Sequence, residues 1–142
     1  MSHLQSRDAA LYVYLAWGTR GDLPVLVSEE LRQAAYLAIT TRTRSQFCHI
    51  LAIGGNAGRI HLIAQFPPSL SVSDVARMAQ DASGSAIAHQ SETFDGRLIS
   101  RDHLWERGFL THTLQKTDAA NAEIYLQQQS VSENSQLALS FN

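Results

Sequence analysis

The stretch "FCHILAIGGNAGRIHLIAQFPP", Phe47 to Pro68, decides the fold of this chain. Two apolar segments, Phe47 to Gly55 and Arg59 to Phe66, flank a cluster of glycines and one asparagine at positions 54–58. Short apolar runs separated by such turn residues are typical of an antiparallel hairpin. The two prolines that follow cannot continue a strand ladder, so we expect the hairpin to end at Phe66.

Upstream of the hairpin, the sequence predicts one strand and one helix. The aromatic and aliphatic run from Leu11 to Thr19 is typical of a strand that is buried on both faces. Gly21, Asp22 and Pro24 break this run. Ser28, followed by two glutamates, predicts a helix that continues to about Ser45.

Downstream, the pattern predicts helix, strand and helix again. Ser71 or Ser73 caps the first helix, and Gly84 weakens its end. Positions 91–108 resemble a loop, residues 109–116 a fourth strand, and a third helix is capped near Asp118. The order β-α-β-β-α-β-α predicts an α+β fold, the ferredoxin-like split βαβ sandwich. We expect an antiparallel sheet with helices on one face, plus a C-terminal helix carrying Tyr125.

Composition predicts one globular domain over residues 1–142, with a core of about 11–130 and a polar tail at 131–142. Hydrophobic residues make up 44% of the chain and charged residues 17%, which is enough apolar material for a core. The chain has one cysteine, no apolar run of about 20 residues, and no basic-then-apolar layout at its beginning. We therefore expect a cytoplasmic protein with no membrane contact. A net charge of −2 neither requires nor excludes a nucleic-acid partner.

The first candidate site lies on the predicted strand 59–66. Side chains two apart on a strand point to the same face, so Arg59 and His61 lie side by side. Two histidines at this spacing would suit a divalent metal, but arginine is only a donor and always charged. The simpler interpretation is a strand histidine with a satisfied hydrogen bond.

The second candidate is Tyr125, which shares a helix face with Gln129 four residues later. A tyrosine can attack a phosphodiester if a nearby cation or base assists the loss of its proton. The alternative is a half-buried helix aromatic with a solvated hydroxyl. His112 falls where it can face the same sheet surface as His61, and its simplest interpretation is structural.

Five segments, taken in order, resemble a known family. They are "WGTRGDLPVL" from Trp17, "GGNAGRIHLIAQFPPS" from Gly54, "SVSD" at 71–74, "LWERGF" at 104–109, and the helix of Tyr125 and Gln129. Over about residues 11–129 the chain is similar to the HUH single-tyrosine insertion-sequence transposases, the IS200-like and REP-associated tyrosine transposases.

The resemblance implies DNA binding and DNA transposition. Such proteins cut and rejoin single-stranded DNA as dimers, recognise hairpins, and form a 5′-phosphotyrosine link. Transferred to this chain, Tyr125 is the nucleophile, and His61 and Gln129 are ligands for Mg²⁺ or Mn²⁺. Arg59 and Arg20 are then candidates for binding phosphate. The implied partners are single-stranded or hairpin DNA and a second copy of the chain.

Arg59 is the main departure from the family pattern, since it stands where the first metal-binding histidine belongs. At an effective dielectric near 20, a guanidinium about 6 Å from a dication repels it by about 5 kcal/mol. This weakens metal binding by several powers of ten. Three functions remain possible. The first is an active or recently active transposase in which Arg59 contacts phosphate directly in place of part of the metal's role. The second is a non-catalytic dimeric module that binds hairpin or single-stranded nucleic acid, and the third is a structural or protein-binding role.

Overall fold

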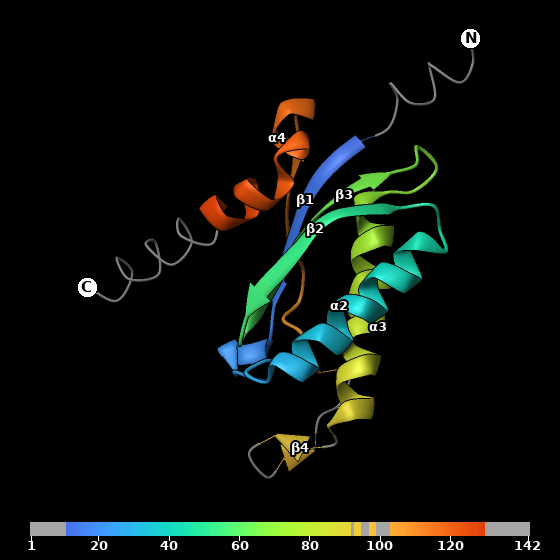
Figure 1. Cartoon of the computed structure of the whole chain (residues 1–142). Helices are drawn as coiled ribbons and strands as arrows, with labels where there is room; N and C mark the ends of the chain where they lie inside the picture. The colour runs from blue at the N-terminus through green and yellow to red at the C-terminus, as the bar shows by residue number, and fades with distance from the viewer. Residues whose placement is uncertain (1–10, 92, 95–96, 99–102, 130–142) are drawn as a thin grey trace.

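The computed structural model of the chain describes residues 11–91, 93–94, 97–98 and 103–129. Its centre is a four-stranded antiparallel sheet in the order β2-β3-β1-β6 (Figure 1). The strands are β1 (Leu11–Gly18), β2 (His49–Asn56), β3 (Arg59–Phe66) and β6 (Leu110–Leu114). One helix connects β1 to β2 and another follows β3, which confirms the predicted α+β, ferredoxin-like order.

β1 lies in the middle of the sheet and is buried on both faces, as the sequence predicts. Val13, Leu15 and Trp17 point to one face, whereas Tyr14 and Ala16 point to the other; each is at most 3% exposed. The strand pairs with β3 along its whole length and with β6 over five residues. The side chains from Tyr12 to Ala16 therefore have neighbours on both adjoining strands.

The β2–β3 hairpin is tighter than its glycine content suggests. The turn consists of Ala57 and Gly58 alone, and the side chain of Asn56 accepts a hydrogen bond from the Gly58 N–H at 2.9 Å. Gly55 lies within β2, where a Cβ atom would overlap the carbonyl oxygen of Arg59. Only glycine leaves the room that this close approach of two backbones requires.

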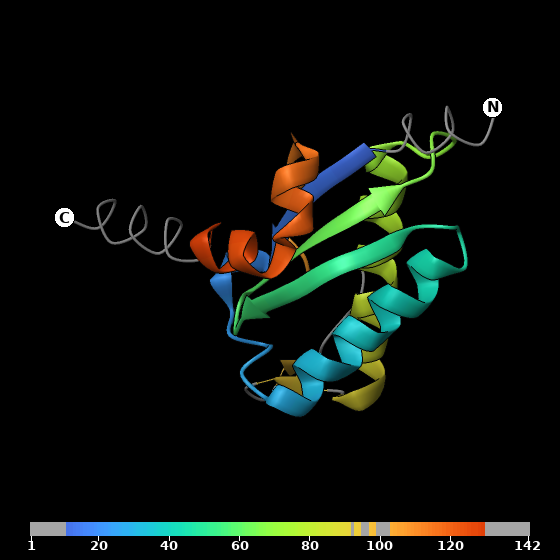
Figure 2. The same ribbon diagram turned by 45° about the horizontal axis from the view of Figure 1, so that its top comes forward.

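Helices α2 (Glu29–Arg44) and α3 (Val72–Gln90) lie side by side on one face of the sheet (Figures 1 and 2). Both predicted starts are confirmed: Ser28 caps α2, and Ser71 forms a reciprocal capping box with Asp74 in α3. Gly84 is buried within α3 and does not end it. Within the described ranges, no helix combines the length and hydropathy needed to span a bilayer.

The core between the sheet and these two helices is formed by aliphatic and aromatic side chains from all of these elements. Its main members are Val13, Leu15, Trp17, Leu31, Ala35, Ile39, Ile60, Leu62, Phe66, Val75, Ala79 and Ile87. Burial of this apolar surface is the main force that holds the helix layer on the sheet.

The C-terminal helical part covers the opposite face of the sheet (Figure 2). It consists of α4 (Lys116–Ala120) and a second helical segment, residues 122–129, separated by Asn121 with φ −117° and ψ 42°. Ala122 and Leu126 pack on the sheet with Ala52, Ile63 and Leu114. The prediction of a cap near Asp118 was wrong: the helix begins at Lys116, so Asp118 lies in its first turn, where an acidic side chain is favourable.

Two further predictions need correction. Positions 91–108 were expected to form a loop, but β4 (Thr93–Phe94) and β5 (Arg97–Leu98) pair as a small hairpin beyond the end of α3 (Figure 1). The second strand begins at His49 rather than Phe47, because Phe47 has a φ of 66° and closes the end of α2. The predicted polar tail at 131–142 lies outside the described residues.

Candidate active site

Four ring side chains from four elements meet on the sheet face that the C-terminal helical part covers. The strand register places Tyr14 of β1 opposite His112 of β6, and Ala16 of β1 opposite His61 of β3. Tyr125 approaches from the helical segment 122–129. We call Tyr14, His61, His112 and Tyr125 the ring cluster.

Tyr14 is the centre of the ring cluster and is fully buried. Its ring stacks on His112 with the centroids 4.6 Å apart and the planes at 17°. It meets His61 and Tyr125 edge-on, each with a centroid separation of 6.0 Å. The Tyr14 hydroxyl lies 3.3 Å from Nδ1 of His61. Tyr14 was absent from the predicted site, although the alternation of side chains along β1 placed it on the right face.

Tyr125 and His112 form the shortest polar contact of the cluster. The Tyr125 hydroxyl lies 2.5 Å from Nε2 of His112. Burial raises the pKa of Tyr125 above its ordinary value, and the nearby Asp118 carboxylate raises that pKa further. Tyr125 also lines a recess of about 230 Å³, together with Asp118 and residues of both helical segments, so solvent reaches it from one side.

His61 is 5% exposed and has small neighbours on both adjoining strands. It lies opposite Ala16 on β1 and opposite Gly54 on β2. A Cβ atom at Gly54 would lie 3.5 Å from Nε2 of His61, so this edge of the imidazole faces the β2 backbone. The His61 environment is therefore shaped by a buried phenol on the Nδ1 side and by a glycine backbone on the Nε2 side.

Arg59 and Arg20 lie toward the end of β1, beyond His61. Arg59 is half-buried opposite Gly18, and Arg20 is exposed in the short 3-10 helix η1 (Arg20–Asp22), two residues beyond Gly18. From Tyr14 to Gly18 the chain advances by roughly 13 Å. The face thus presents phenol, imidazole and guanidinium groups in succession along β1 and β3.

The "LWERGF" segment positions Arg20. Trp105 is buried, packs edge-on against Trp17, and donates its indole N–H to the carbonyl oxygen of Gln80 in α3 at 3.0 Å. The adjoining Leu104 carbonyl accepts the backbone N–H of Arg20 at 2.8 Å. Trp105 therefore has the anchoring role that its position in a connection suggests.

The residues present do not fit a divalent cation. On this strand only His61 is an imidazole, and Arg59 stands at the position that shares its face. Across the described ranges, no three side chains of histidine, cysteine, aspartate or glutamate come together as a metal site. Gln129 is half-buried one helical turn after Tyr125. The Tyr125 hydroxyl contacts His112, and Nδ1 of His61 contacts the Tyr14 hydroxyl.

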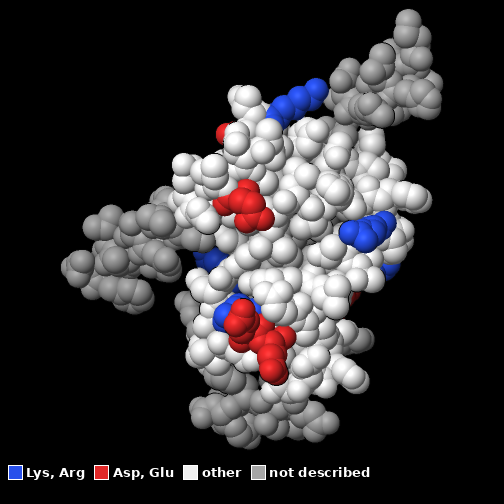
Figure 3. Space-filling view, viewed as in Figure 1, with Lys and Arg blue, Asp and Glu red and all other residues white. Residues whose placement is uncertain are grey.

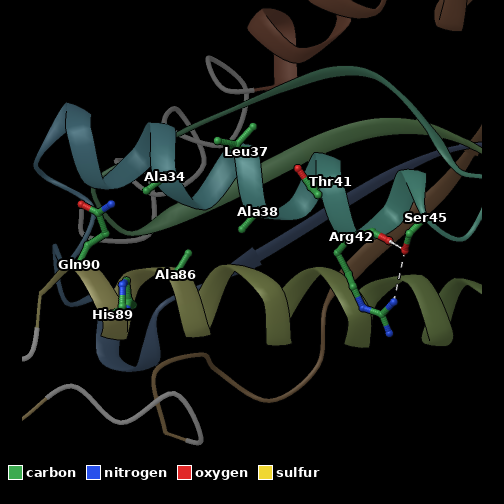
Figure 4. A pocket seen from close by; sticks show the side chains of 9 residues that line it. All are labelled: Ala34, Leu37, Ala38, Thr41, Arg42, Ser45, Ala86, His89 and Gln90. Atoms are coloured by element: carbon green, nitrogen blue, oxygen red, sulfur yellow. Dashed lines mark hydrogen bonds between the residues drawn. The ribbon is translucent and has the colours of Figure 1, made fainter.

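The other described surfaces offer fewer groups that could bind or activate a substrate. Basic side chains are scattered singly over the face shown in Figure 3, rather than gathered in a patch. A groove of about 540 Å³ lies between α2 and α3, with Ala34, Ala38 and Ala86 along it (Figure 4). At its edge Arg42 donates to the Ser45 hydroxyl at 3.4 Å. This groove belongs to the helix layer, on the far side of the sheet from the ring cluster.

Comparison with known proteins finds a matching family and similar folds. The family model described as "Transposase IS200 like" matches residues 9–129. A candidate transposase from Deinococcus radiodurans R1 has a similar structure, with a TM-score of 0.60, 18% identity, and coverage of 84% of this chain and 91% of that protein. A REP-associated tyrosine transposase bound to a REP hairpin gives a TM-score of 0.56 and 16% identity, covering 80% of this chain and 61% of its own. No curated protein sequence matches the chain.

Proposed function

The chain belongs to the family of IS200-like transposases, and from this membership we propose that it binds hairpin or single-stranded DNA and attacks a phosphodiester through Tyr125. The product would be a 5′-phosphotyrosine link and a free 3′-hydroxyl. The REP hairpin in the structure of the tyrosine transposase supports this class of partner. The family resemblance also supports action as a homodimer.

The observation that carries this proposal is the position of the Tyr125 hydroxyl. It is in hydrogen-bond contact with the imidazole of His112 on the sheet face that also holds His61, and the Tyr125 side chain lines a recess open to solvent. A nucleophile with a base within hydrogen-bond reach is the arrangement that covalent catalysis requires.

Arg59 and Arg20 supply the positive charge that the reaction needs. A guanidinium can form two parallel hydrogen bonds to phosphate oxygens and stays charged at every relevant pH. We therefore propose that Arg59 binds the scissile phosphate or its neighbour, and that Arg20 binds the strand further along. In this scheme direct contact with arginine replaces part of the charge stabilisation that a metal supplies in the family.

Arg59 also supports a second candidate function. A chain that keeps the fold but lacks one metal-binding histidine can act as a non-catalytic module that binds hairpin or single-stranded nucleic acid. The scattered basic side chains predict modest affinity for such a module, with a salt dependence that reflects the small number of phosphates contacted.

The deciding experiment incubates the protein with labelled single-stranded hairpin libraries in EDTA and, separately, in Mn²⁺. The catalytic function predicts a covalent adduct in EDTA, located at Tyr125 by mass spectrometry and absent from Tyr125→Phe. Tyr36→Phe is the matched control, because Tyr36 lies on α2 in the opposite layer. Salt-sensitive binding without any adduct would establish the non-catalytic module instead. Absence of both would refute the DNA-binding proposal.

A further inference from the structure

The contact between His112 and Tyr125 has a chemical role that the family pattern does not assign. We propose that His112 is the general base that removes the proton from the Tyr125 hydroxyl as it attacks the scissile phosphodiester. This inference rests on the proposed function, and it names the group that activates the nucleophile.

The geometry of His112 suits a base. Nε2 lies 2.5 Å from the hydroxyl oxygen of Tyr125, within the range for direct proton transfer. The stack on Tyr14, at 4.6 Å and 17°, fixes the plane of the imidazole. Tyr14 is itself buried in the central strand and in contact with His61. The nucleophile, the base and the group that orients the base therefore form one connected set.

The charges around Tyr125 make such a base necessary. Asp118 of α4 lines the same recess, and both its carboxylate and burial raise the pKa of Tyr125, so the phenolate does not form in advance. The other titratable groups facing the pair are Tyr14 on β1 and, beyond it, His61 on β3. Among these groups the imidazole of His112 touches the hydroxyl that must lose its proton.

The step balances with the groups on this face and water. A lone pair of the Tyr125 oxygen forms the bond to phosphorus, and the phenolic proton passes to Nε2 of His112. The bond from phosphorus to the 3′-oxygen breaks, and that oxygen keeps the electron pair and takes a proton from water. When the strand is rejoined, a 3′-hydroxyl gives its proton to hydroxide and its oxygen forms the bond to phosphorus. The bond from phosphorus to the Tyr125 oxygen breaks, and the imidazolium of His112 returns its proton to that oxygen.

A purely structural alternative is that His112 only clips the helical segment 122–129 to the sheet. The two roles differ in what His112→Gln does. The glutamine side-chain oxygen can accept the same hydrogen bond, but it cannot take up the proton at neutral pH. A structural role of His112 would therefore be retained in His112→Gln, whereas its role as a base would be lost.

The test uses phenylmethanesulfonyl fluoride, a small electrophile that reacts with activated hydroxyls, so no DNA is needed. Labelling at each tyrosine is measured by peptide mass spectrometry, with Tyr12 and Tyr36 as references within the same chain. We expect Tyr125 to react at least tenfold faster than Tyr36, with a rate that already reaches its plateau below the pH range in which phenols ionise. His112→Gln and His112→Ala should both lose this advantage while keeping the wild-type circular dichroism spectrum.

Wild-type labelling of Tyr125 in His112→Gln would overturn the proposal, as would a wild-type pH profile that follows phenol ionisation alone. The profile of the unmodified protein remains decisive if either variant fails to fold. The outcome is also separable from that of the DNA experiment. If labelling depends on His112 but no DNA adduct forms, the role of His112 as a base is supported and DNA as the substrate is refuted. If a DNA adduct forms equally well in His112→Gln, DNA as the substrate is supported and the role of His112 as a base is refuted.

Discussion

Changing Arg59 to histidine should strengthen the binding of a divalent cation at His61, which we expect to be weak in the wild-type chain. Arg59 and His61 are two residues apart on β3 and share a face, so the new imidazole would lie roughly 6.6 Å along the strand from the existing one. At that distance, and with an effective dielectric near 20, the guanidinium repels a dication at His61 by about 5 kcal/mol. Removing it should tighten binding by a factor of about 10³ to 10⁴.

Isothermal titration calorimetry with Mn²⁺ measures this effect in four proteins: the wild type, Arg59→Gln, Arg59→His and the double variant Arg59→His/His61→Ala. The wild type should bind in the millimolar range or more weakly. Arg59→Gln isolates the loss of the charge, and Arg59→His adds a ligand, so affinity should rise in that order. The double variant should return to the level of Arg59→Gln or below.

Two results would refute this reasoning. The first is micromolar Mn²⁺ binding by the wild type that disappears in His61→Ala, because it would show that Arg59 does not prevent coordination. The second is equal affinity of Arg59→Gln and the wild type, because the repulsion worked out above would then be absent. In the second case, the guanidinium must be directed away from the Nε2 side of His61.

Three further predictions concern stability and are tested by urea denaturation monitored by circular dichroism. Gly55→Ala should lower the free energy of unfolding by about 2 kcal/mol or more, because its Cβ atom overlaps the backbone across the hairpin. The Cβ atom of Gly54→Ala makes only ordinary contacts, so this variant should lose less than half as much. Equal losses in the two variants would contradict this reasoning. Tyr14→Phe should lower the free energy of unfolding by about 1 to 2 kcal/mol, because it removes the hydroxyl that contacts Nδ1 of the buried His61. A change near zero would mean that this contact contributes little to stability. Hydrogen bonds from the cap of α3 hold the pKa of Asp74 below its ordinary value of 3.8, so its stabilising effect is complete at neutral pH and is lost as the pH falls below 3.8. The unfolding midpoints of the wild type and Asp74→Asn should therefore differ at pH 7 and approach each other as the pH falls below 3.8, and a constant difference would be inconsistent with this linkage.

The fold was predictable to a large extent because its signals are local. Ser28 and Ser71 cap their helices by contacts within three residues, and glycines with two prolines bound the hairpin. The start of the last helix and the break at Asn121 were not predictable in this way. No proline or glycine marks either point, and the break is set by packing of the segment 122–129 on the sheet.

The candidate site was predictable only in part, because its contacts join distant parts of the chain. Tyr125 and His61 could be proposed from their own segments. The pairing of Tyr14 with His112 depends on the register between the first and last strands of the sheet, which local sequence does not specify. The sequence therefore placed His112 on the correct face of the sheet but did not predict its contacts, and it did not predict Tyr14 as a residue of the site.

The two halves of the ring cluster belong to parts of the chain with very different resistance to opening. β1 is hydrogen-bonded on both sides and covered on both faces, so its amides should exchange with solvent only when the whole domain unfolds. The eight residues 122–129 rest on the sheet through Ala122, Leu126 and Tyr125, after a break at Asn121, and should exchange by opening on their own. We therefore expect Tyr14 to stay in place while Tyr125 departs and returns, and heating should break the contact between Tyr125 and His112 several degrees before the core melts.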